Sequence, residues 1–328
     1  MTAGHEPYWS QFPGLREELT ANGLVFENMV KELDVEVVSA PFVDSVAKSR
    51  QASELFKAQN IDLLFCFLST YVTSSTVIPA VLHTGVPVVM VALQPRRKLD
   101  YANTTTYMQL ANDNICSLPE IAGVLVRAGK PAAGMIVGTL HDDARASAEL
   151  KMWCQAANAA KAFKYANIGY LGHTYEGMYD MNSDATAFTA AFGSHVRMLE
   201  MCDLAQRVEA ASESDVQAKI SEILTIFDVQ EPFLDPITKP VKEEDLAWAA
   251  RVAVGLDRLI ADFGLTGLAY YYRGLDQNLY ERIASNMVLG NSLLTGKGIP
   301  LAGEADLKTC AAMLIMDRLE AGGSFAEL

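Results

Sequence analysis

Short apolar runs that alternate with amphipathic helical segments constrain the fold of this chain most strongly. Residues 61–68 and 86–93 are predominantly apolar, and a helical pattern near residues 74–83 separates them. Runs of this length are too short to cross a bilayer and are typical of parallel strands that are buried on both faces. The alternation therefore predicts βαβ units, in which helices cover a parallel sheet.

The alternation begins again after a long helical segment at residues 142–164. Further strands are predicted at 167–171, 196–200 and 268–272, and further helices at 183–192, 213–227, 243–263, 276–294 and 306–319. The sequence thus predicts two consecutive Rossmann-like, doubly wound α/β domains with parallel sheets. We place the first domain at residues 1–164 and the second at residues 165–328.

The first predicted helix, residues 15–33, has no evident strand before it. A doubly wound domain normally opens with a strand at or near the centre of its sheet. Residues 1–3 precede the polar-aromatic N-terminal segment, and three residues span roughly 10 Å when fully extended. We therefore expect the first strand to be missing and the chain to be clipped at its start.

Charge and cysteine content narrow the class of protein. The chain of 328 residues carries a formal net charge of -14, which repels nucleic-acid phosphates, so we expect no nucleic-acid partner. Its five cysteines are widely spaced and form no C-x-x-C motif, which is typical of reduced thiols in a cytoplasmic protein. The first residues do not resemble a signal peptide, and no apolar run is long enough to span a membrane, so we expect no membrane partner.

Acidic residues on either side of one helix carry the most specific chemical signal. Glu304 and Asp306 precede an apolar helix, and Gly322 and Gly323 follow it, ahead of Glu327. One interpretation is structural, because acidic residues stabilise a helix N-terminus and glycines end a helix. The functional interpretation is that Glu304 and Glu327 act together on a metal and a sugar.

Chain length allows the two glutamates to meet. The helix at residues 306–319 is roughly 21 Å long at 1.5 Å per residue. Residues 320–327 can run back about 26 Å when extended, provided that the chain reverses at the two glycines. Two carboxylates at one end of a helix could bind a hard divalent cation and exchange protons with a sugar, although they cannot fill its coordination shell alone.

Aromatic and histidine side chains are further candidates. His5, Tyr8 and Trp9 belong to a polar-aromatic N-terminal segment that suits sugar contacts, and the alternative interpretation of this segment is a frayed terminus. His141 and His173 follow predicted strands, so either could line a cleft. A structural role is the alternative for both histidines.

Several segments, taken in order along the chain, resemble the L-arabinose isomerase family and its L-fucose isomerase-like relatives. They are HEPYW with QFPG at 5–14, GH with GM at 172–178, YYYRG at 270–274, AGEADLKT at 302–309 and GGSFAE at 322–327. The resemblance covers essentially the whole chain and implies an N-terminal and a central α/β domain. It also implies that the C-terminal β-rich domain of the family is missing, so we expect the chain to be a fragment.

The resemblance implies a metal and sugar site as well. Family members bind Mn²⁺ through two glutamates, which match Glu304 and Glu327, and through two histidines that lie beyond the last residue of this sequence. The same glutamates serve as catalytic base and acid. Asp306 and Phe325 match positions that line the sugar pocket. Ala305 replaces a usual glycine, which is acceptable if its φ angle is negative.

The resemblance further implies subunit sharing. The segment with His5, Tyr8 and Trp9 matches a loop that reaches the active site of a neighbouring subunit, which implies a homo-oligomer, either a trimer or a hexamer. The implied activity is metal-dependent isomerisation of an aldose to a ketose, in which a proton moves between C1 and C2 through an ene-diol. We expect the chain to be inactive alone, because half of the metal ligands are missing. The alternative is a non-catalytic, two-lobed sugar-binding module or a degenerate isomerase.

Overall fold

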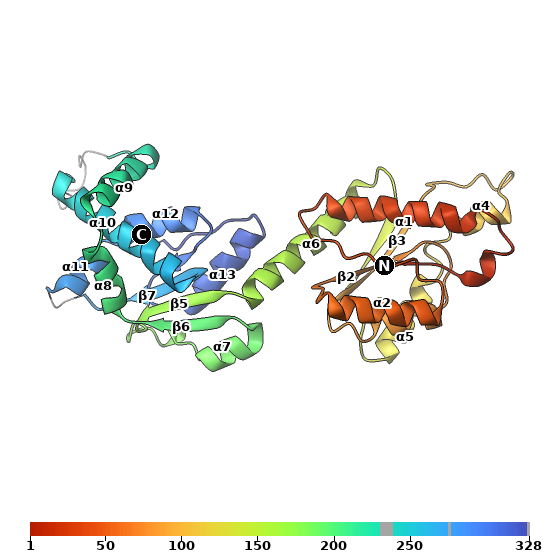
Figure 1. The fold of residues 1–328 in the computed structure, drawn as a ribbon, viewed down its shortest axis with the longest axis horizontal. Helices are drawn as coiled ribbons and strands as arrows, with labels where there is room; N and C mark the ends of the chain where they lie inside the picture. The colour runs from red at the N-terminus through yellow and green to blue at the C-terminus, as the bar shows by residue number, and fades with distance from the viewer. Residues whose placement is uncertain (230–238, 275–276, 327–328) are drawn as a thin grey trace. The chain divides into compact units, whose positions relative to one another are not determined.

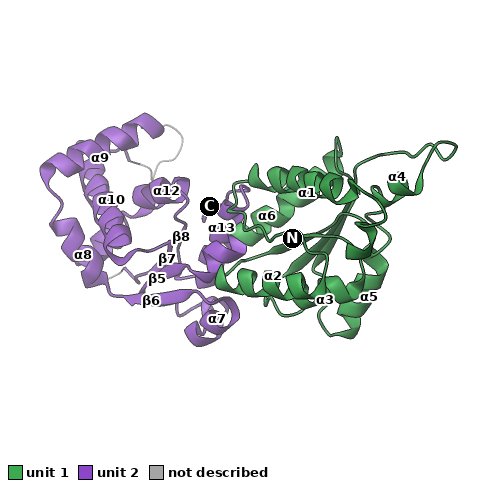
Figure 2. Ribbon diagram, turned by 45° about the vertical axis from the view of Figure 1, so that its right-hand side comes forward, with its two compact units in different colours: residues 1–158 green, residues 159–328 purple. Residues whose placement is uncertain are grey.

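The computed structural model describes residues 1–229, 239–274 and 277–326. The chain divides into two compact units, Met1–Asn158 and Ala159–Leu328 (Figure 2). Among the described residues, each unit contains a four-stranded parallel sheet. The division falls within α6 (Ala144–Lys164), the helix at whose end we placed the domain boundary. The predicted fold class, two consecutive α/β domains with parallel sheets, is confirmed.

The sheet of the first unit has the order β1-β2-β3-β4. Its strands are β1 (Thr2–Ala3), β2 (Leu64–Leu68), β3 (Val88–Gln94) and β4 (Gly134–Thr139). Beyond β1, Val43 forms an isolated parallel bridge to Ala3. The chain therefore moves outward from β1 to Val43 and then returns past β1 to β2. This reversal of direction is the topological switch of a doubly wound sheet.

Helices cover both faces of this sheet (Figure 1). One face packs against α2 (Val46–Ala58), α3 (Ser74–Val81) and α5 (Leu118–Arg127), and the other against α1 (Leu15–Lys31) and α6. Consecutive strand residues supply the two cores, because Cys66 and Leu68 face one side while Phe67 stacks on Phe26 of α1 on the other.

The structure contains a strand before α1, so the expectation that the first strand is missing is wrong. Thr2 and Ala3 pair with Phe67 and Leu68 of β2. The amino group of Met1 donates a hydrogen bond to the Phe65 carbonyl oxygen at 2.9 Å. Two paired residues are too few to produce an apolar run, so the local sequence carries no signal for this strand. The same unit also contains η1 (Glu6–Tyr8) and α4 (Thr106–Leu110).

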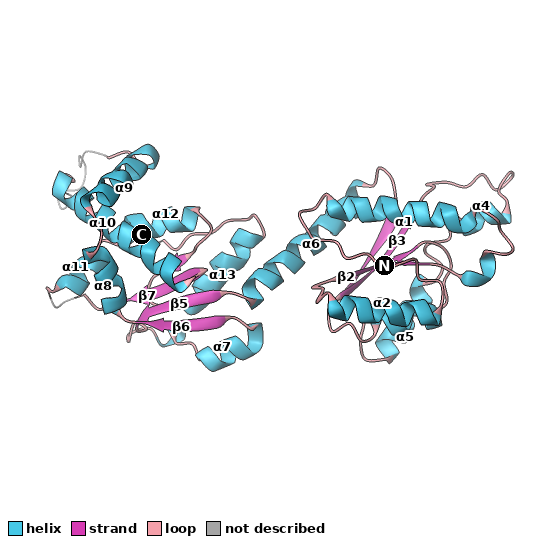
Figure 3. Ribbon diagram, in the orientation of Figure 1, coloured by secondary structure: helices cyan, strands magenta, loops and turns pink. Residues whose placement is uncertain are grey.

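The sheet of the second unit has the order β6-β5-β7-β8. Figure 3 shows β6, β5 and β7 side by side, and β8 is labelled in Figure 2. The predicted strands correspond to β5 (Asn167–Gly172), β6 (His195–Leu199) and β7 (Gly267–Tyr271). The fourth strand, β8 (Leu301–Ala302), was not predicted, because it has two residues and is identified only by its pairing with β7.

Helices also cover both faces of the second sheet. One face packs against α7 (Ala185–Phe192) and α13 (Leu307–Arg318). The other packs against α8 (Met201–Glu209), α10 (Glu243–Phe263), α11 (Leu279–Ala284) and α12 (Val288–Gly296), with α9 (Glu213–Ile226) outside α10. The predicted single helix at 276–294 is therefore two helices. The unit also contains η2 (Tyr179–Met181), and no described helix in the chain has the length and apolar character needed to span a membrane.

Candidate active site

Three neighbouring strands of the second unit place candidate residues at the carboxyl edge of its sheet. His173 follows β5, Tyr271 ends β7, and Glu304 lies just after β8. Strands β5 and β8 both pair with β7 in parallel, so their carboxyl ends meet at one edge of the sheet. This edge is where ligands bind in open α/β sheets.

The turn that carries Glu304 has an unusual backbone. Glu304 and Ala305 both adopt left-handed conformations, with φ angles of 56° and 54°. The amide of Ala305 donates to the Tyr270 carbonyl oxygen at 2.9 Å, and the amide of Tyr175 donates to the Glu304 carbonyl oxygen at 3.3 Å. The sequence-based condition for alanine at this position, a negative φ, is therefore not met. The left-handed alanine costs about 1 kcal/mol relative to glycine, and these hydrogen bonds hold it in place.

Asp306 forms the N-cap of α13. Its Oδ1 accepts hydrogen bonds from the amides of Lys308 and Thr309, at 3.0 and 3.1 Å. Its Oδ2 accepts from the Thr309 hydroxyl at 2.6 Å, and the residue is buried. The structural interpretation of an acid at the helix start thus describes Asp306, which anchors the turn that carries Glu304. Its proposed contact with a sugar stays a prediction.

Three aromatic rings cluster at this sheet edge. The Tyr271 ring lies 5.3 Å from the His173 ring and 5.2 Å from the Tyr175 ring, measured between centroids. Burial raises the pKa of Tyr271, and the negative charge of Glu304 raises it further. Tyr271 therefore stays protonated at neutral pH and keeps a hydroxyl hydrogen to donate.

A cavity of about 680 Å³ adjoins Tyr271 and Glu304. Its wall comes from the end of β7, from α11 and α12, from the turn at Gly303 and Glu304, and from residues 324–326. This volume lies within the range of small-molecule sites. Phe325, a residue predicted to contact the sugar, lines the cavity together with Glu304.

The chain after α13 reverses, as the predicted site requires. Gly322 adopts a left-handed φ of 69°, and Phe325 lies against Gly303. A Cβ atom on Gly303 would lie 2.7 Å from Phe325 Cε1, so a larger residue there would displace the ring. Glu327 lies outside the described residues, and its meeting with Glu304 stays a prediction.

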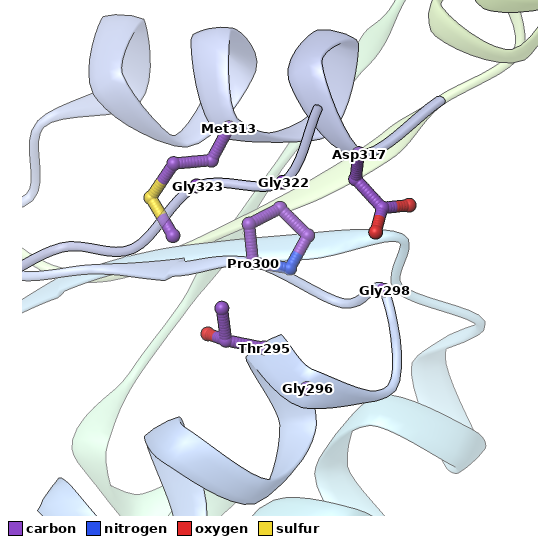
Figure 4. Close-up of a pocket in the computed structure, with 8 residues that line it drawn as sticks. All are labelled: Thr295, Gly296, Gly298, Pro300, Met313, Asp317, Gly322 and Gly323. Carbon is purple, nitrogen blue, oxygen red and sulfur yellow. The ribbon is translucent and has the colours of Figure 1, made fainter. Parts of the chain in front are cut away.

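A second cavity, of about 290 Å³, lies at the amino-terminal end of β8 (Figure 4). Figure 4 shows Pro300, Met313 and the two glycines Gly322 and Gly323 around it. Asp317 is the charged residue of this lining, and it already pairs with Arg318 at 3.3 Å. This cavity therefore offers less chemistry than the one beside Glu304.

The N-terminal candidates belong to the first unit. The His5 ring lies 4.8 Å from the Tyr8 ring and 5.7 Å from the Tyr71 ring. Trp9 Nε1 donates to Asp44 Oδ2 at 3.0 Å. The segment is thus folded against the carboxyl end of β1 rather than frayed. Its contribution to a neighbouring subunit's site stays a prediction.

The described residues do not form a metal site by themselves. Within residues 1–229, 239–274 and 277–326, no group of three His, Cys, Asp or Glu side chains is placed to hold a metal ion. Glu304 offers carboxylate oxygens of the type that Mn²⁺ accepts, but one carboxylate does not make a ligand set. We therefore derive no chemical step through a metal.

Two residues of the site region were not predicted from the sequence: Asn291, which lines the cavity, and Tyr175, whose ring lies beside Tyr271. Asn291 lies on α12, and Tyr175 follows β5. The signal for Asn291 was its spacing from Val288 and Thr295, which places all three on one side of a helix. Tyr175 carried no local signal, because its ring reaches Tyr271 only through the pairing of β5 with β7.

Comparisons with known proteins find sequence similarity between this chain and sugar isomerases. Residues 181–322 match the protein family described as L-arabinose isomerase central domain. The chain is 25% identical over 191 residues to the L-arabinose isomerase of Salmonella arizonae, a match that covers 56% of this chain and 36% of that protein. It is 24% identical, over the same shares, to the L-arabinose isomerase of Escherichia coli O139:H28. The match thus spans about a third of the length of these relatives.

Proposed function

We propose, from the premise that this chain belongs to an L-arabinose isomerase-like family, that it takes part in the isomerisation of an aldose such as L-arabinose to its ketose. The observation that carries the proposal is the placement of Glu304. Its half-buried carboxylate lies at the carboxyl edge of a parallel sheet, beside a cavity large enough for a pentose.

The proposed chemistry is a proton transfer between adjacent carbons. Glu304 takes a proton from C2, beside the C1 carbonyl, which gives an ene-diolate. O1 gains a proton while the hydroxyl at C2 loses one, and the carbon-bound proton is returned to C1, which leaves the carbonyl at C2. A neutral Tyr271 donates a hydrogen bond to a sugar oxygen, which stabilises the charge that develops there. Glu327 is the proposed second acid–base group, on the ground of the motif at residues 322–327.

Other parts of the proposal rest on the family resemblance. We propose that Glu304 and Glu327 would be among the ligands of a bound Mn²⁺, which would supply Lewis acidity toward the sugar oxygens. We also propose a cytoplasmic homo-oligomer, trimeric or hexameric, in which His5, Tyr8 and Trp9 contact the sugar of a neighbouring subunit. Mass photometry of the purified chain tests the assembly state, and a monomer at all concentrations would contradict it.

A non-catalytic sugar-binding module is the second candidate. It is favoured by one observation, the lack of a three-ligand metal group among the described residues. Such a module would use the same cavity to hold a sugar but would not exchange its protons.

Hydrogen exchange in the sugar separates the two functions. The chain is incubated with L-arabinose in D₂O, with and without Mn²⁺, and NMR follows ketose formation and deuterium at C1 and C2. The sequence-based expectation is that the chain alone is inactive, whereas the proposed role of Glu304 requires detectable exchange. If exchange is detected, both signals should fall by about 100-fold or more in Glu304→Gln, the range for loss of an acid–base group. Glu209→Gln is the matched control, because Glu209 is exposed on α8 and is not part of the cavity lining. Binding without exchange would instead identify the sugar-binding module.

A further inference from the structure

The large cavity of the second unit has a polar wall that the proposed proton transfer does not use. Tyr270, on β7, and Asn291, on α12, both line this cavity. Asn291 Nδ2 donates a hydrogen bond to Tyr270 Oη. This bond fixes the plane of the Asn291 amide within the wall.

The other polar atom of the Asn291 amide is unpaired. Asn291 Oδ1 is shielded from solvent and has no hydrogen-bond partner among the residues that the structure describes. Interchange of the amide oxygen and nitrogen would leave the nitrogen unpaired instead, so one unpaired polar atom remains in either orientation. Buried polar groups in native proteins are nearly always paired, and an exception in a cavity wall points to a partner that binds there.

A hydroxyl group fits this position best, because it both donates and accepts hydrogen bonds and so satisfies either orientation of the amide. The neighbouring wall has the same character. Ser292 and Thr295, on the same side of α12 as Asn291, also line the cavity. The wall therefore suits a ligand that carries several hydroxyl groups.

Charge excludes a phosphorylated ligand. Glu281 and Glu304 line the cavity, whereas none of its described lining residues is lysine, arginine or histidine. Two carboxylates repel a phosphate group, and no cation is present in this lining to compensate.

We propose that Asn291, held by Tyr270, is a specificity-determining residue that recognises one hydroxyl group of a neutral, unphosphorylated sugar. This inference rests on the proposed function, because it takes the cavity beside Glu304 as the sugar site. Asn291 acts in binding, and Glu304 acts in proton transfer.

The test is a binding comparison between sugars that differ by one hydroxyl. Calorimetry measures the affinity of the full chain for L-arabinose, for each of its monodeoxy analogues and for L-arabinose 5-phosphate. One deoxy analogue should bind the native chain about tenfold more weakly, which is the effect of one hydrogen bond. The phosphate ester should also bind at least tenfold more weakly than the free sugar.

Variants then assign that hydroxyl to Asn291. In Asn291→Leu, L-arabinose should bind about tenfold more weakly while the affinity for that one analogue stays unchanged. Tyr270→Phe should reduce the difference in affinity between L-arabinose and that analogue, although the Asn291 amide is retained. This variant replaces Asn291→Leu in the test if Asn291→Leu does not fold. The control is Asn286→Leu, because Asn286 donates to the Arg282 carbonyl oxygen and is not part of the cavity lining.

The inference would be overturned if Asn291→Leu weakened the binding of every sugar by the same factor. It would also be overturned if no deoxy analogue bound the native chain more weakly than L-arabinose, or if no sugar bound. The proton-exchange assay shows whether this inference or the proposed function has failed. Proton exchange that depends on Glu304, without hydroxyl discrimination by Asn291, defeats the inference alone. Discrimination by Asn291 without proton exchange defeats the isomerase proposal alone.

Discussion

Gly172 is the position in the candidate site where one added methyl group should cost most. It ends β5 with a left-handed φ of 82° and pairs with Tyr271 of β7. A Cβ atom there would lie less than 3.0 Å from the Tyr271 carbonyl oxygen and 3.4 Å from its carbonyl carbon. The obstacle is backbone, which cannot rotate away as a side chain can.

Two costs add in Gly172→Ala. The left-handed conformation costs about 1 kcal/mol for alanine. Separation of the ends of β5 and β7 costs a further 1–3 kcal/mol or so, as for an overpacked core. We therefore expect the free energy of unfolding of the second unit to fall by about 2–4 kcal/mol. Gly264→Ala is the matched control, because Gly264 has a φ of 59° and no atom within 4 Å of an added Cβ, and it should cost about 1 kcal/mol.

Urea unfolding measured by Trp248 fluorescence tests this difference. Trp248 lies on α10 in the second unit, whereas Trp9 and Trp153 lie in the first. A Trp9→Phe, Trp153→Phe background therefore reports on the second unit alone, and any cost of the background cancels between the variants. Equal losses in Gly172→Ala and Gly264→Ala would refute the close approach of β5 to β7 and with it the geometry of the sheet edge.

Three other predictions concern the thiols, the helix cap and the tyrosine. Cys116 and Cys202 are exposed, so a thiol reagent should modify two thiols quickly in the native chain and the three buried ones only after unfolding. Rapid modification of all five thiols would contradict the burial of the other three. Asp306→Ala should lower the free energy of unfolding by about 1–2 kcal/mol through loss of the α13 cap, and an unchanged urea midpoint would contradict this role. Glu304→Gln should lower the pKa of Tyr271 toward its ordinary value, with burial still holding the pKa above it, as a ¹³C-tyrosine NMR titration can show. Because the folded pKa of Tyr271 is raised, its contribution to stability is full below pH of about 10 and falls at higher pH, and the fall should be smaller in the variant.

The sequence by itself determined the fold class and the general location of the site. Apolar runs at residues 61–68 and 86–93 are long enough to specify buried strands, and the helices between them specify a parallel sheet. The acidic turn at Glu304 and the glycines at Gly322 and Gly323 predicted a helix with a chain reversal after it. Both signals lie within single segments of the chain, so they can be recognised without knowledge of the tertiary structure.

Only the tertiary structure decided which residues surround that turn. Strands β1 and β8 have two residues each and exist because neighbouring strands pair with them. The left-handed φ of Ala305 is held by the Tyr270 carbonyl oxygen, and the unpaired amide of Asn291 becomes visible only beside Tyr270. These features depend on contacts between residues that are distant in the chain. Periodicity and local motifs report the preferences of one segment, and they carry no information about which other segment packs against it.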